Sequence, residues 1–310
     1  MSLTDSPRTA LNLLPWGLQE DGSFALTAEQ LPSVLQQAAE AGFDAVMADP
    51  PPGASLSGYR TLLAEHGMQP APGYYSIPAT AGSSELTAGA GRHAAEQAAL
   101  GLTETFLATA MCEQRMQRPA CGTGYDAARL DRIIDRVTRA ASAMAAEGVH
   151  ACLHPHVGTW IETEWEVRTV LEATSADVLG FGPDSGHLFW AGMDPANVVK
   201  AYADRVGGVH LKDVHHTVAQ SAALAETGYA EATVNGNLWT ELGRGDVDLD
   251  RFLGELPASF TGWYIVEVDV PDRCTALESS LRSREWLDSR LRHSKPTGVD
   301  SSGPPAGAPQ

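Results

Sequence analysis

Short apolar runs alternate with amphipathic stretches along most of this chain. The apolar runs have the length of buried strands, whereas the stretches between them repeat apolar residues every three or four positions, as helices with one buried face do. Strands are predicted at residues 8–14, 42–49, 68–76, 103–111, 149–156, 176–184, 206–214 and 262–270. This regular alternation of strand and helix favours parallel strands connected by helices.

Residues 125–148 carry the clearest helical pattern. Their large apolar side chains fall on one helical face, at Leu130, Ile133, Ile134, Val137 and Met144. Capping signals predict the starts of three further helices, at Thr27 with Gln30, at Thr163 with Glu166, and at the pair Asp194–Pro195.

About eight strand–helix units predict one closed (β/α)8 TIM barrel over residues 1–293. The alternative is a doubly wound open sheet, but its nucleotide-binding versions lack support because no glycine-rich phosphate motif follows a strand. The long connection at 214–243 is polar, and we expect it to act as a lid on the C-terminal face of the barrel. The Pro-, Gly- and Ser-rich residues 294–310 predict a disordered tail.

Composition narrows the class of partner. The chain is 43% hydrophobic and 19% charged, as in a soluble globular protein, and its formal net charge is -18. That charge disfavours binding to nucleic acid or to an anionic membrane surface. The chain shows no secretory signal and no apolar run long enough to span a membrane. Four scattered cysteines without metal-binding spacing are typical of reduced thiols, so a cytoplasmic location is expected.

Side chains that can bind metal stand at the ends of four consecutive predicted strands. They are His154 with His156, then Asp184, then His210, then Glu267. The catalytic groups of a TIM barrel lie at the C-terminal ends of its strands, so these side chains should meet at one rim. A carboxylate in the apolar run "WYIVEV" is costly to bury unless a cation compensates it. We therefore predict one divalent metal held by His154, Asp184, His210 and Glu267.

The mixture of donors indicates the kind of metal. Two imidazoles and two carboxylates suit Mn²⁺ or Co²⁺, or else Zn²⁺ or Fe²⁺, better than the all-oxygen sites of Mg²⁺ and Ca²⁺. Such an ion would bind adjacent oxygens of a hydroxy-ketone and stabilise an enediolate as a proton leaves carbon. His156, His187 and Lys212 are then candidates for proton transfer or for binding a substrate oxygen.

Five segments together resemble the xylose-isomerase-like TIM-barrel superfamily of sugar isomerases and epimerases. They are "LHPHVGT", "PDSGHLFWAGMDP", "VHLKDV", "GRGDVDLDRF" and "GWYIVEVD". The similarity covers about residues 145–290 and is strongest to inosose dehydratases and related keto-sugar lyases. It implies a barrel enzyme of carbohydrate metabolism with one divalent metal, often manganese or cobalt, and a polyol, keto-sugar or cyclitol substrate. Asp184, His210 and Glu267 match three usual ligands, and His154 stands where the fourth, a glutamate, is usual.

That departure bears on the reaction. Sugar epimerases of the superfamily use two glutamates as acid and base, and a histidine that binds metal is a poor base through the same nitrogen. The resemblance therefore implies a dehydratase or β-eliminating lyase, with His156, Lys212 and Glu267 as catalytic residues. A keto-sugar isomerase or epimerase is the alternative, and a non-catalytic barrel subunit is a third. A DNA-repair endonuclease shares this barrel, but the charge of -18 opposes it.

Three further residues are predicted to bind substrate. Trp16 follows the first strand, where the superfamily places an aromatic residue against the sugar, although ordinary packing explains it equally well. His187 lies just beyond Asp184, and Arg244 lies between glycines that allow close approach of its loop. Arg115 is expected to pair with an acidic residue on the protein surface rather than with a substrate anion. The sequence leaves open the phosphorylation state of the substrate and whether the chain forms a homo-oligomer or needs a partner subunit.

Overall fold

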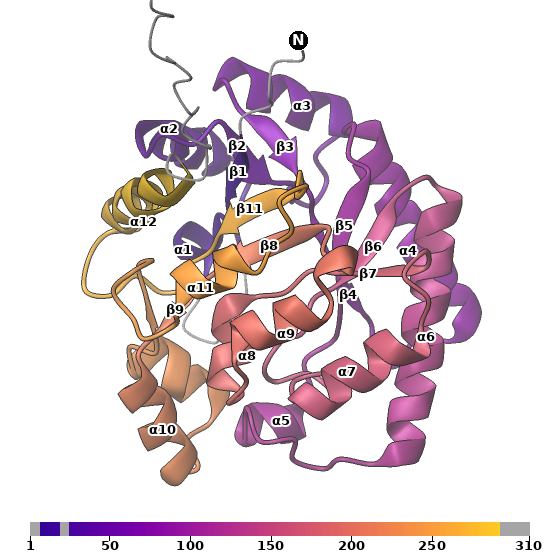
Figure 1. Cartoon of the computed structure of the whole chain (residues 1–310). Coiled ribbons are helices and arrows are strands. Elements are labelled where there is room, and N and C mark those ends of the chain that lie inside the picture. Colours follow the sequence, from indigo (N-terminus) through magenta and orange to yellow (C-terminus); the bar gives the residue numbers. More distant parts are fainter. Residues whose placement is uncertain (1–6, 19–24, 292–310) are drawn as a thin grey trace, which may run out of the picture.

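A ring of parallel strands forms the centre of the protein in this computed structural model, which describes residues 7–18 and 25–291 (Figure 1). One sheet has the order β3-β2-β1-β11-β8 and the other β4-β5-β6-β7. These strands are β1 (Arg8–Leu11), β2 (Ala45–Met47), β3 (Gln69–Ala71), β4 (Tyr74–Ile77), β5 (Glu104–Thr109), β6 (His150–Leu153), β7 (Leu179–Phe181), β8 (Gly208–Leu211) and β11 (Trp263–Val266). The tail predicted at residues 294–310 lies outside the described residues.

The two sheets join into a barrel at two seams. At the first, β3 and β4 are consecutive pieces of the predicted third strand, interrupted at Pro72, which has no backbone N–H to donate to a strand ladder. At the second, parallel bridges pair Phe181 with Val206 and Asp184 with His210. The predicted (β/α)8 barrel is thereby confirmed.

Helices cover the outside of the ring (Figure 1). The longer ones are α2 (Leu31–Glu40), α3 (Leu56–Glu65), α4 (Ser83–Ala99), α6 (Ala127–Ala146), α7 (Glu164–Ala173), α9 (Pro195–Ala201), α10 (His216–Leu224) and α12 (Ala276–Leu291). The shorter ones are α1 (Leu14–Gly17), α5 (Glu113–Gln117), α8 (Ser185–Trp190), η1 (Ala203–Arg205), η2 (Glu231–Asn235) and α11 (Leu249–Gly254). The apolar stripe predicted on α6 is buried, except for the half-buried Ile134. No helix in the described part of the chain is long and apolar enough to cross a membrane.

Helix starts follow the predicted capping signals, with one shift. Thr163 and Glu166 form a complete capping box before α7, and the Asp194 side chain caps α9. Thr27 and Gln30 also exchange hydrogen bonds, but they do so within a turn, and α2 begins only after Gln30. The local signal therefore predicts the turn correctly but places the N-cap of the helix three residues too early, at Thr27 and not at Gln30.

The segment between β8 and α11 packs over one end of the barrel. Its strands β9 (Asp213–Val214) and β10 (Trp239–Thr240) pair antiparallel, and α10 and η2 lie between them. Tyr229 and Trp239 are buried, and each of their rings lies within 5.5 Å of the Trp190 ring. The Asp213 carboxylate accepts the backbone N–H groups of Val214, Gly243, Gly245 and Val247. The segment predicted as a lid is thus a packed cover, and its opening stays a prediction.

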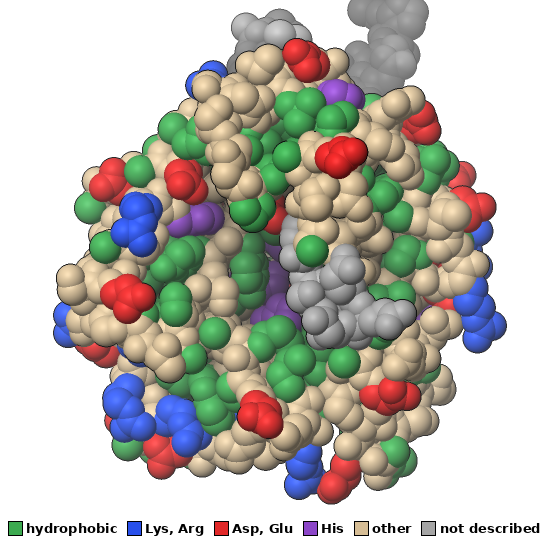
Figure 2. All heavy atoms as spheres, turned by 180° about the vertical axis from the view of Figure 1, so that it is seen from behind, with side chains coloured by type: hydrophobic (Ala, Val, Ile, Leu, Met, Phe, Trp, Pro, Cys, Tyr) green, Lys and Arg blue, Asp and Glu red, His purple; other side chains and the backbone are tan. Residues whose placement is uncertain are grey.

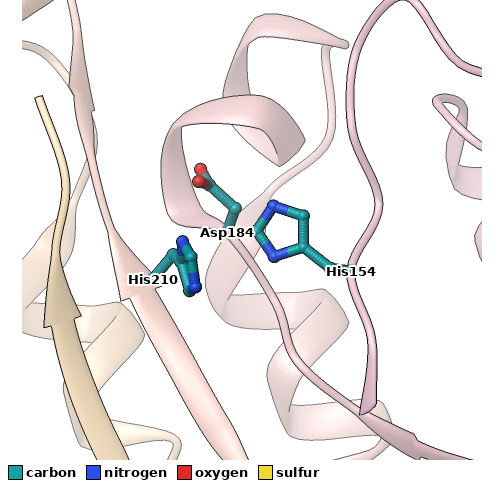
Figure 3. Close-up of side chains that lie close together, drawn as sticks. All are labelled: His154, Asp184 and His210. Carbon is teal, nitrogen blue, oxygen red and sulfur yellow. The ribbon is translucent and has the colours of Figure 1, made fainter. Parts of the chain in front are cut away.

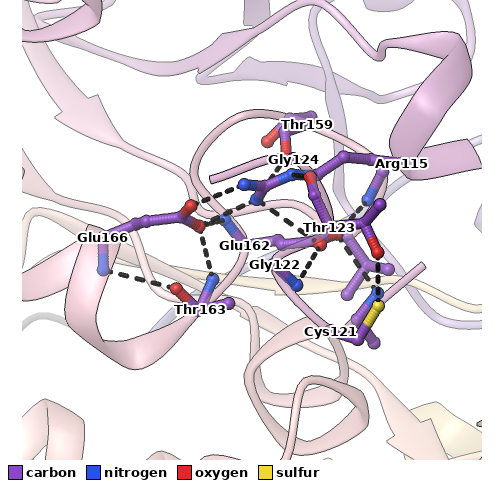
Figure 4. A network of polar contacts seen from close by, with 12 residues as sticks. Arg115, Cys121, Gly122, Thr123, Gly124, Thr159, Glu162, Thr163 and Glu166 are labelled. Atoms are coloured by element: carbon purple, nitrogen blue, oxygen red, sulfur yellow. Dashed lines mark hydrogen bonds and ion pairs between the residues drawn. The ribbon is translucent and has the colours of Figure 1, made fainter. Parts of the chain in front are cut away.

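A buried ion network ties two loops together (Figure 4). Arg115 of α5 donates to both carboxylate oxygens of Glu166, at 2.8 and 2.6 Å, and lies 3.4 Å from Glu162. Glu162 accepts the backbone N–H groups of Gly122 and Gly158, at 2.9 and 2.8 Å. The expected pairing of Arg115 with acidic side chains is confirmed, but it lies in the interior and not at the surface, since the Arg115 side chain is 1% exposed. Because the partners come from separate segments, the network fixes the loop after β5 against the loop after β6.

Replacing Arg115 by alanine should lower the free energy of unfolding by about 3–5 kcal/mol, because two buried carboxylates lose their counter-ion. Urea unfolding followed by circular dichroism measures this change. Arg118→Ala is the control, since Arg118 pairs with Glu226 at the surface, with 54% of its side chain exposed. Its effect should stay below about 1 kcal/mol. Equal effects of the two substitutions would contradict a structural role for the network.

Candidate active site

A cavity of about 360 Å³ opens at the C-terminal ends of the barrel strands. Its wall contains His154, His156, His210 and Glu267, together with residues from β4 and from the loops after β1, β2 and β5. Figure 2 shows a central hollow in the surface with histidine side chains at its base. Four of the residues singled out in the sequence therefore share one cavity.

His154, Asp184 and His210 converge within this part of the barrel (Figure 3). His154 directly follows β6, Asp184 caps α8, and His210 lies in β8. One potential ligand atom from each lies within 4.8 Å of the others, and all three residues are buried. The parallel bridge between Asp184 and His210 explains their proximity, because it sets the end of β7 directly beside β8.

Each of these three residues has a buried polar atom without a hydrogen-bond partner among the described residues. These atoms are His154 Nδ1, Asp184 Oδ2 and His210 Nε2. Asp184 Oδ2 has an ion pair with Lys212 Nζ at 3.6 Å but no hydrogen bond. Leaving buried polar atoms without hydrogen bonds costs free energy, and such atoms are rare. Nitrogen and carboxylate donors converging in this way fit a divalent transition ion.

Glu267 stands beside this group and is engaged on both oxygens. Its Oε2 accepts hydrogen bonds from His210 Nδ1 at 2.7 Å and from Asn12 Nδ2 at 2.6 Å, and its Oε1 accepts one from Lys212 Nζ at 2.5 Å. Because a carboxylate accepts here, His210 Nδ1 carries the proton and Nε2 keeps its lone pair. Glu267 belongs to a second, overlapping group of potential ligands with Asp184 and His187.

Lys212 is fully buried among three carboxylates. Its Nζ lies 2.5 Å from Glu267, 2.8 Å from Asp269 and 3.6 Å from Asp184. Burial alone would lower the pKa of Lys212, but these carboxylates outweigh burial and hold its pKa well above the ordinary value. Burial would likewise raise the pKa of Glu267, yet Lys212 and His210 hold it well below its usual range. An ammonium bound in this way balances charge, and the geometry gives no support to the predicted role of Lys212 in proton transfer.

His156 faces the cavity in one tautomer. Its Nδ1 lies 2.7 Å from the carbonyl oxygen of Val157, which can only accept, so Nδ1 carries the proton and Nε2 keeps its lone pair. Burial, with Lys212 as a second cause, lowers the pKa of His156 to about 4. The centre of the His156 ring lies 3.8 Å from the centre of the His187 ring. The Nε2 atom of His187 lies 3.3 Å from Lys212 Nζ. His187 is thus placed to support His156, and it does not line the cavity.

Comparison with known families agrees with this geometry. The sequence model described as Xylose isomerase-like TIM barrel matches residues 35–290, most of the chain. The chain belongs to this family.

The chain is similar to curated inosose dehydratases and to several solved TIM-barrel structures. The inosose dehydratase of Bacillus cereus (strain AH820) is 27% identical over 162 residues, which are 52% of this chain and 54% of that protein. The chain thus matches about half the length of such curated relatives. A xylose isomerase-like TIM barrel protein from Mycobacterium smegmatis in complex with magnesium has a TM-score of 0.69 at 19% identity, covering 95% of this chain and 99% of that one. An L-ribulose 3-epimerase has a TM-score of 0.68 at 14% identity, covering 93% and 95%.

Like His187, the two other residues predicted to bind substrate do not line the cavity. The Trp16 indole N–H donates to Gln37 at 3.1 Å, and its ring packs against the apolar core. Arg244 has 55% of its side chain exposed and lies 3.9 Å from Glu241. Neither residue contributes to the cavity wall, so the structure gives no support to their predicted roles.

Two polar residues of the cavity wall were missed in the sequence. Asn12 follows β1 and holds Glu267, and Asp49 follows β2, with its pKa raised by burial. Both stand just after a predicted apolar strand, and the rule that polar side chains at strand ends face the site would have found them.

Replacing Lys212 by methionine should lower the free energy of unfolding by about 3–5 kcal/mol, because the buried carboxylates around it lose their counter-ion. Urea unfolding in the presence of a chelator measures this, so that no metal replaces the lost charge. Lys200→Met is the matched control, since Lys200 pairs with Glu255 at the surface. It should cost less than about 1 kcal/mol. If Lys212→Met is no worse than this control, Lys212 does not balance the site.

Proposed function

We propose that the protein is a divalent-metal-dependent dehydratase that removes water from a keto-cyclitol or keto-sugar. The supporting observation is that buried His154, Asp184 and His210 bring potential ligand atoms within 4.8 Å of one another, beside a cavity that neutral His156 lines. The similarity to inosose dehydratases supports a dehydratase reaction, over about half of their length.

His154, Asp184 and His210 would hold the metal, with Glu267 as the fourth predicted ligand. Their donor set favours Mn²⁺ or Co²⁺, with Zn²⁺ and Fe²⁺ as alternatives. A bound divalent ion supplies a positive charge that makes the carbon next to a ketone more acidic. Glu267 also orients His210, because its carboxylate accepts the Nδ1 proton and keeps Nε2 free to bind.

His156 is the proposed base. Its Nε2 has a free lone pair, and the carbonyl oxygen of Val157 holds the ring in the required tautomer. In the proposed reaction His156 takes the proton from the carbon beside the ketone, and the electron pair forms a carbon–carbon double bond as the neighbouring carbon–oxygen bond breaks. The same proton then protonates the departing hydroxyl group, which leaves as water. The buried rings of Tyr229 and Trp190, which pack close to His156 and His187, exclude bulk water from this proton transfer.

An isomerase or epimerase is the second candidate, because a protein with the same fold is an L-ribulose 3-epimerase. Epimerisation needs proton exchange on two opposite faces of one carbon. Glu267 and Asp49 line this cavity, whereas Asp184 does not reach its wall. His154 occupies the strand end where the resemblance to sugar epimerases leads us to expect the second glutamate. A histidine in place of that glutamate favours elimination.

Metal binding is tested with ligand variants. His154→Ala and His210→Ala should each reduce bound metal from about one ion per chain to a trace, whereas Glu267→Gln should weaken binding about 10–100-fold by releasing the orientation of His210. Metal content by mass spectrometry and competition with a chelator for Mn²⁺ measure these changes. His215→Ala is the control, since His215 pairs with Asp272 away from the cavity. Full metal content in His154→Ala would refute the assigned ligands, and a wild-type protein without divalent metal would favour the non-catalytic alternative.

The reaction is tested with inososes, keto-sugars and 3-keto-glycosides in the presence of Mn²⁺ or Co²⁺. New enone absorbance and the loss of 18 mass units, the mass of one water, identify dehydration, whereas a product of unchanged mass identifies isomerisation or epimerisation. His156→Ala should retain its metal and lower turnover by about 10²–10⁴-fold, the usual contribution of a general base. Unchanged turnover in this variant would exclude His156 as the base.

A further inference from the structure

A second cavity, of about 340 Å³, lies next to the candidate active site. It is bounded by the ends of β4 and β5, by the first half of α6 and by Trp160. Thr109, the last residue of β5, lines both cavities. The two spaces are therefore neighbours on the same rim of the barrel.

Three arginines line this second cavity, and no carboxylate of residues 7–18 or 25–291 does. Arg129, Arg132 and Arg136 follow one another at helical spacing, so they share one face of α6. The whole chain has a formal net charge of -18, with 39 acidic residues against 21 basic ones. This cavity is therefore positively charged, although the protein as a whole is negatively charged. Its three guanidinium groups would attract an anion.

Two of these arginines are held in place by the backbone. Arg129 donates to the carbonyl oxygen of Gly124 at 2.5 Å, and its guanidinium lies 4.1 Å from the centre of the Trp160 ring. Arg136 donates to the carbonyl oxygens of Pro78 and Ala81. A guanidinium has five N–H donors, so each arginine keeps several for a ligand while its position is fixed in advance.

The Arg132 guanidinium and the Thr109 hydroxyl are available to bind a ligand in this cavity. Within residues 7–18 and 25–291, Arg132 forms no hydrogen bond or ion pair, and it is exposed to solvent. Thr109 is 7% exposed, and its buried Oγ1 has no hydrogen-bond partner in the same part of the chain. A buried hydroxyl without a partner is costly, and a ligand oxygen between the two cavities would satisfy it.

We infer that the arginine cavity binds an oxyanion, either a carboxylate or a phosphate monoester, carried by the substrate whose reacting carbons occupy the first cavity. That the anion belongs to the substrate rests on the proposed function, because His156 and the metal ligands define where the reacting carbons lie. Arginine forks bind both kinds of oxyanion through paired N–H donors, which makes this cavity a determinant of substrate specificity. Thr109 would contact the part of the substrate that joins the anion to the reacting ring.

Equilibrium binding tests the cavity without reference to turnover. Glucose 6-phosphate, gluconate and glucose are titrated by calorimetry into the full-length protein as purified, with its metal content measured. We expect one of the two anions to bind and neutral glucose to bind at least about tenfold more weakly, since a charge-assisted contact to an oxyanion contributes about one order of magnitude or more. Preference for the phosphate or for the carboxylate identifies the anionic group.

The Arg132→Gln variant locates the binding. It should weaken anion binding about tenfold without unfolding the protein, because Arg132 makes no bond within the described chain. Arg139→Gln removes the same charge from the same helix outside the cavity, where Arg139 pairs with Asp135, and it should bind the anion as the wild type does. Equal affinity in Arg132→Gln and wild type, or no binding of either anion, would overturn the inference.

The two proposals fail separately. Loss of anion binding in Arg132→Gln, with the anion still bound by His154→Ala, supports the arginine cavity even if no dehydration is found. Anion binding that disappears in His154→Ala but not in Arg132→Gln assigns the anion to the metal group instead, and the inference is then wrong.

Discussion

The ammonium group of Lys212 holds the mouth of the barrel together electrostatically. Buried carboxylates of Asp184, Glu267 and Asp269 all lie within 3.6 Å of its Nζ atom. Ions buried to this extent are tolerated only when they are paired. One ammonium serves three carboxyl groups here, and burial raises the pKa of Asp184 and raises that of Asp269 to about 7. These carboxyl groups lie close to the imidazole nitrogens of His154 and His210 that have no hydrogen-bond partner in the described chain. A bound cation would stabilise the ionised carboxylates and occupy the free nitrogen lone pairs, and this is the physical basis of the proposed metal centre.

Strand periodicity and register bring these groups to one place. His210 and Lys212 are two residues apart, as are Glu267 and Asp269, so each pair points to the same side of its strand. β8 and β11 are parallel neighbours whose register pairs Leu211 with Val266, which sets the two inward-facing pairs directly beside each other. The bridge between Asp184 and His210 continues the arrangement to the next strand. Five side chains from three separate segments thus become one cluster through ordinary sheet geometry.

Two neighbouring cavities at the rim of the barrel would each bind a different part of the proposed substrate. The first holds histidines and a carboxylate beneath a packed cover, where neutral His156 can exchange a proton away from bulk water. The second holds arginines fixed by backbone carbonyls and by Trp160. The buried network around Arg115 keeps the loop after β5 against the loop that carries Trp160. Rigid loops at both cavities reduce the entropy that substrate binding would otherwise cost.

The sequence alone determined the barrel and the strand ends that carry its polar groups, because hydrophobic periodicity is a local property of the chain. The rule that functional groups follow strands found His154, Asp184, His210 and Glu267, and applied to the first two strands it would have found Asn12 and Asp49 as well. Only the tertiary structure decided the partner of each group. It engaged both oxygens of Glu267 with His210, Asn12 and Lys212. It turned Trp16 toward Gln37, left Arg244 exposed, and gathered three arginines of α6 around a second cavity. Those outcomes depend on contacts across the barrel and on side-chain orientation, which no local pattern of residues encodes.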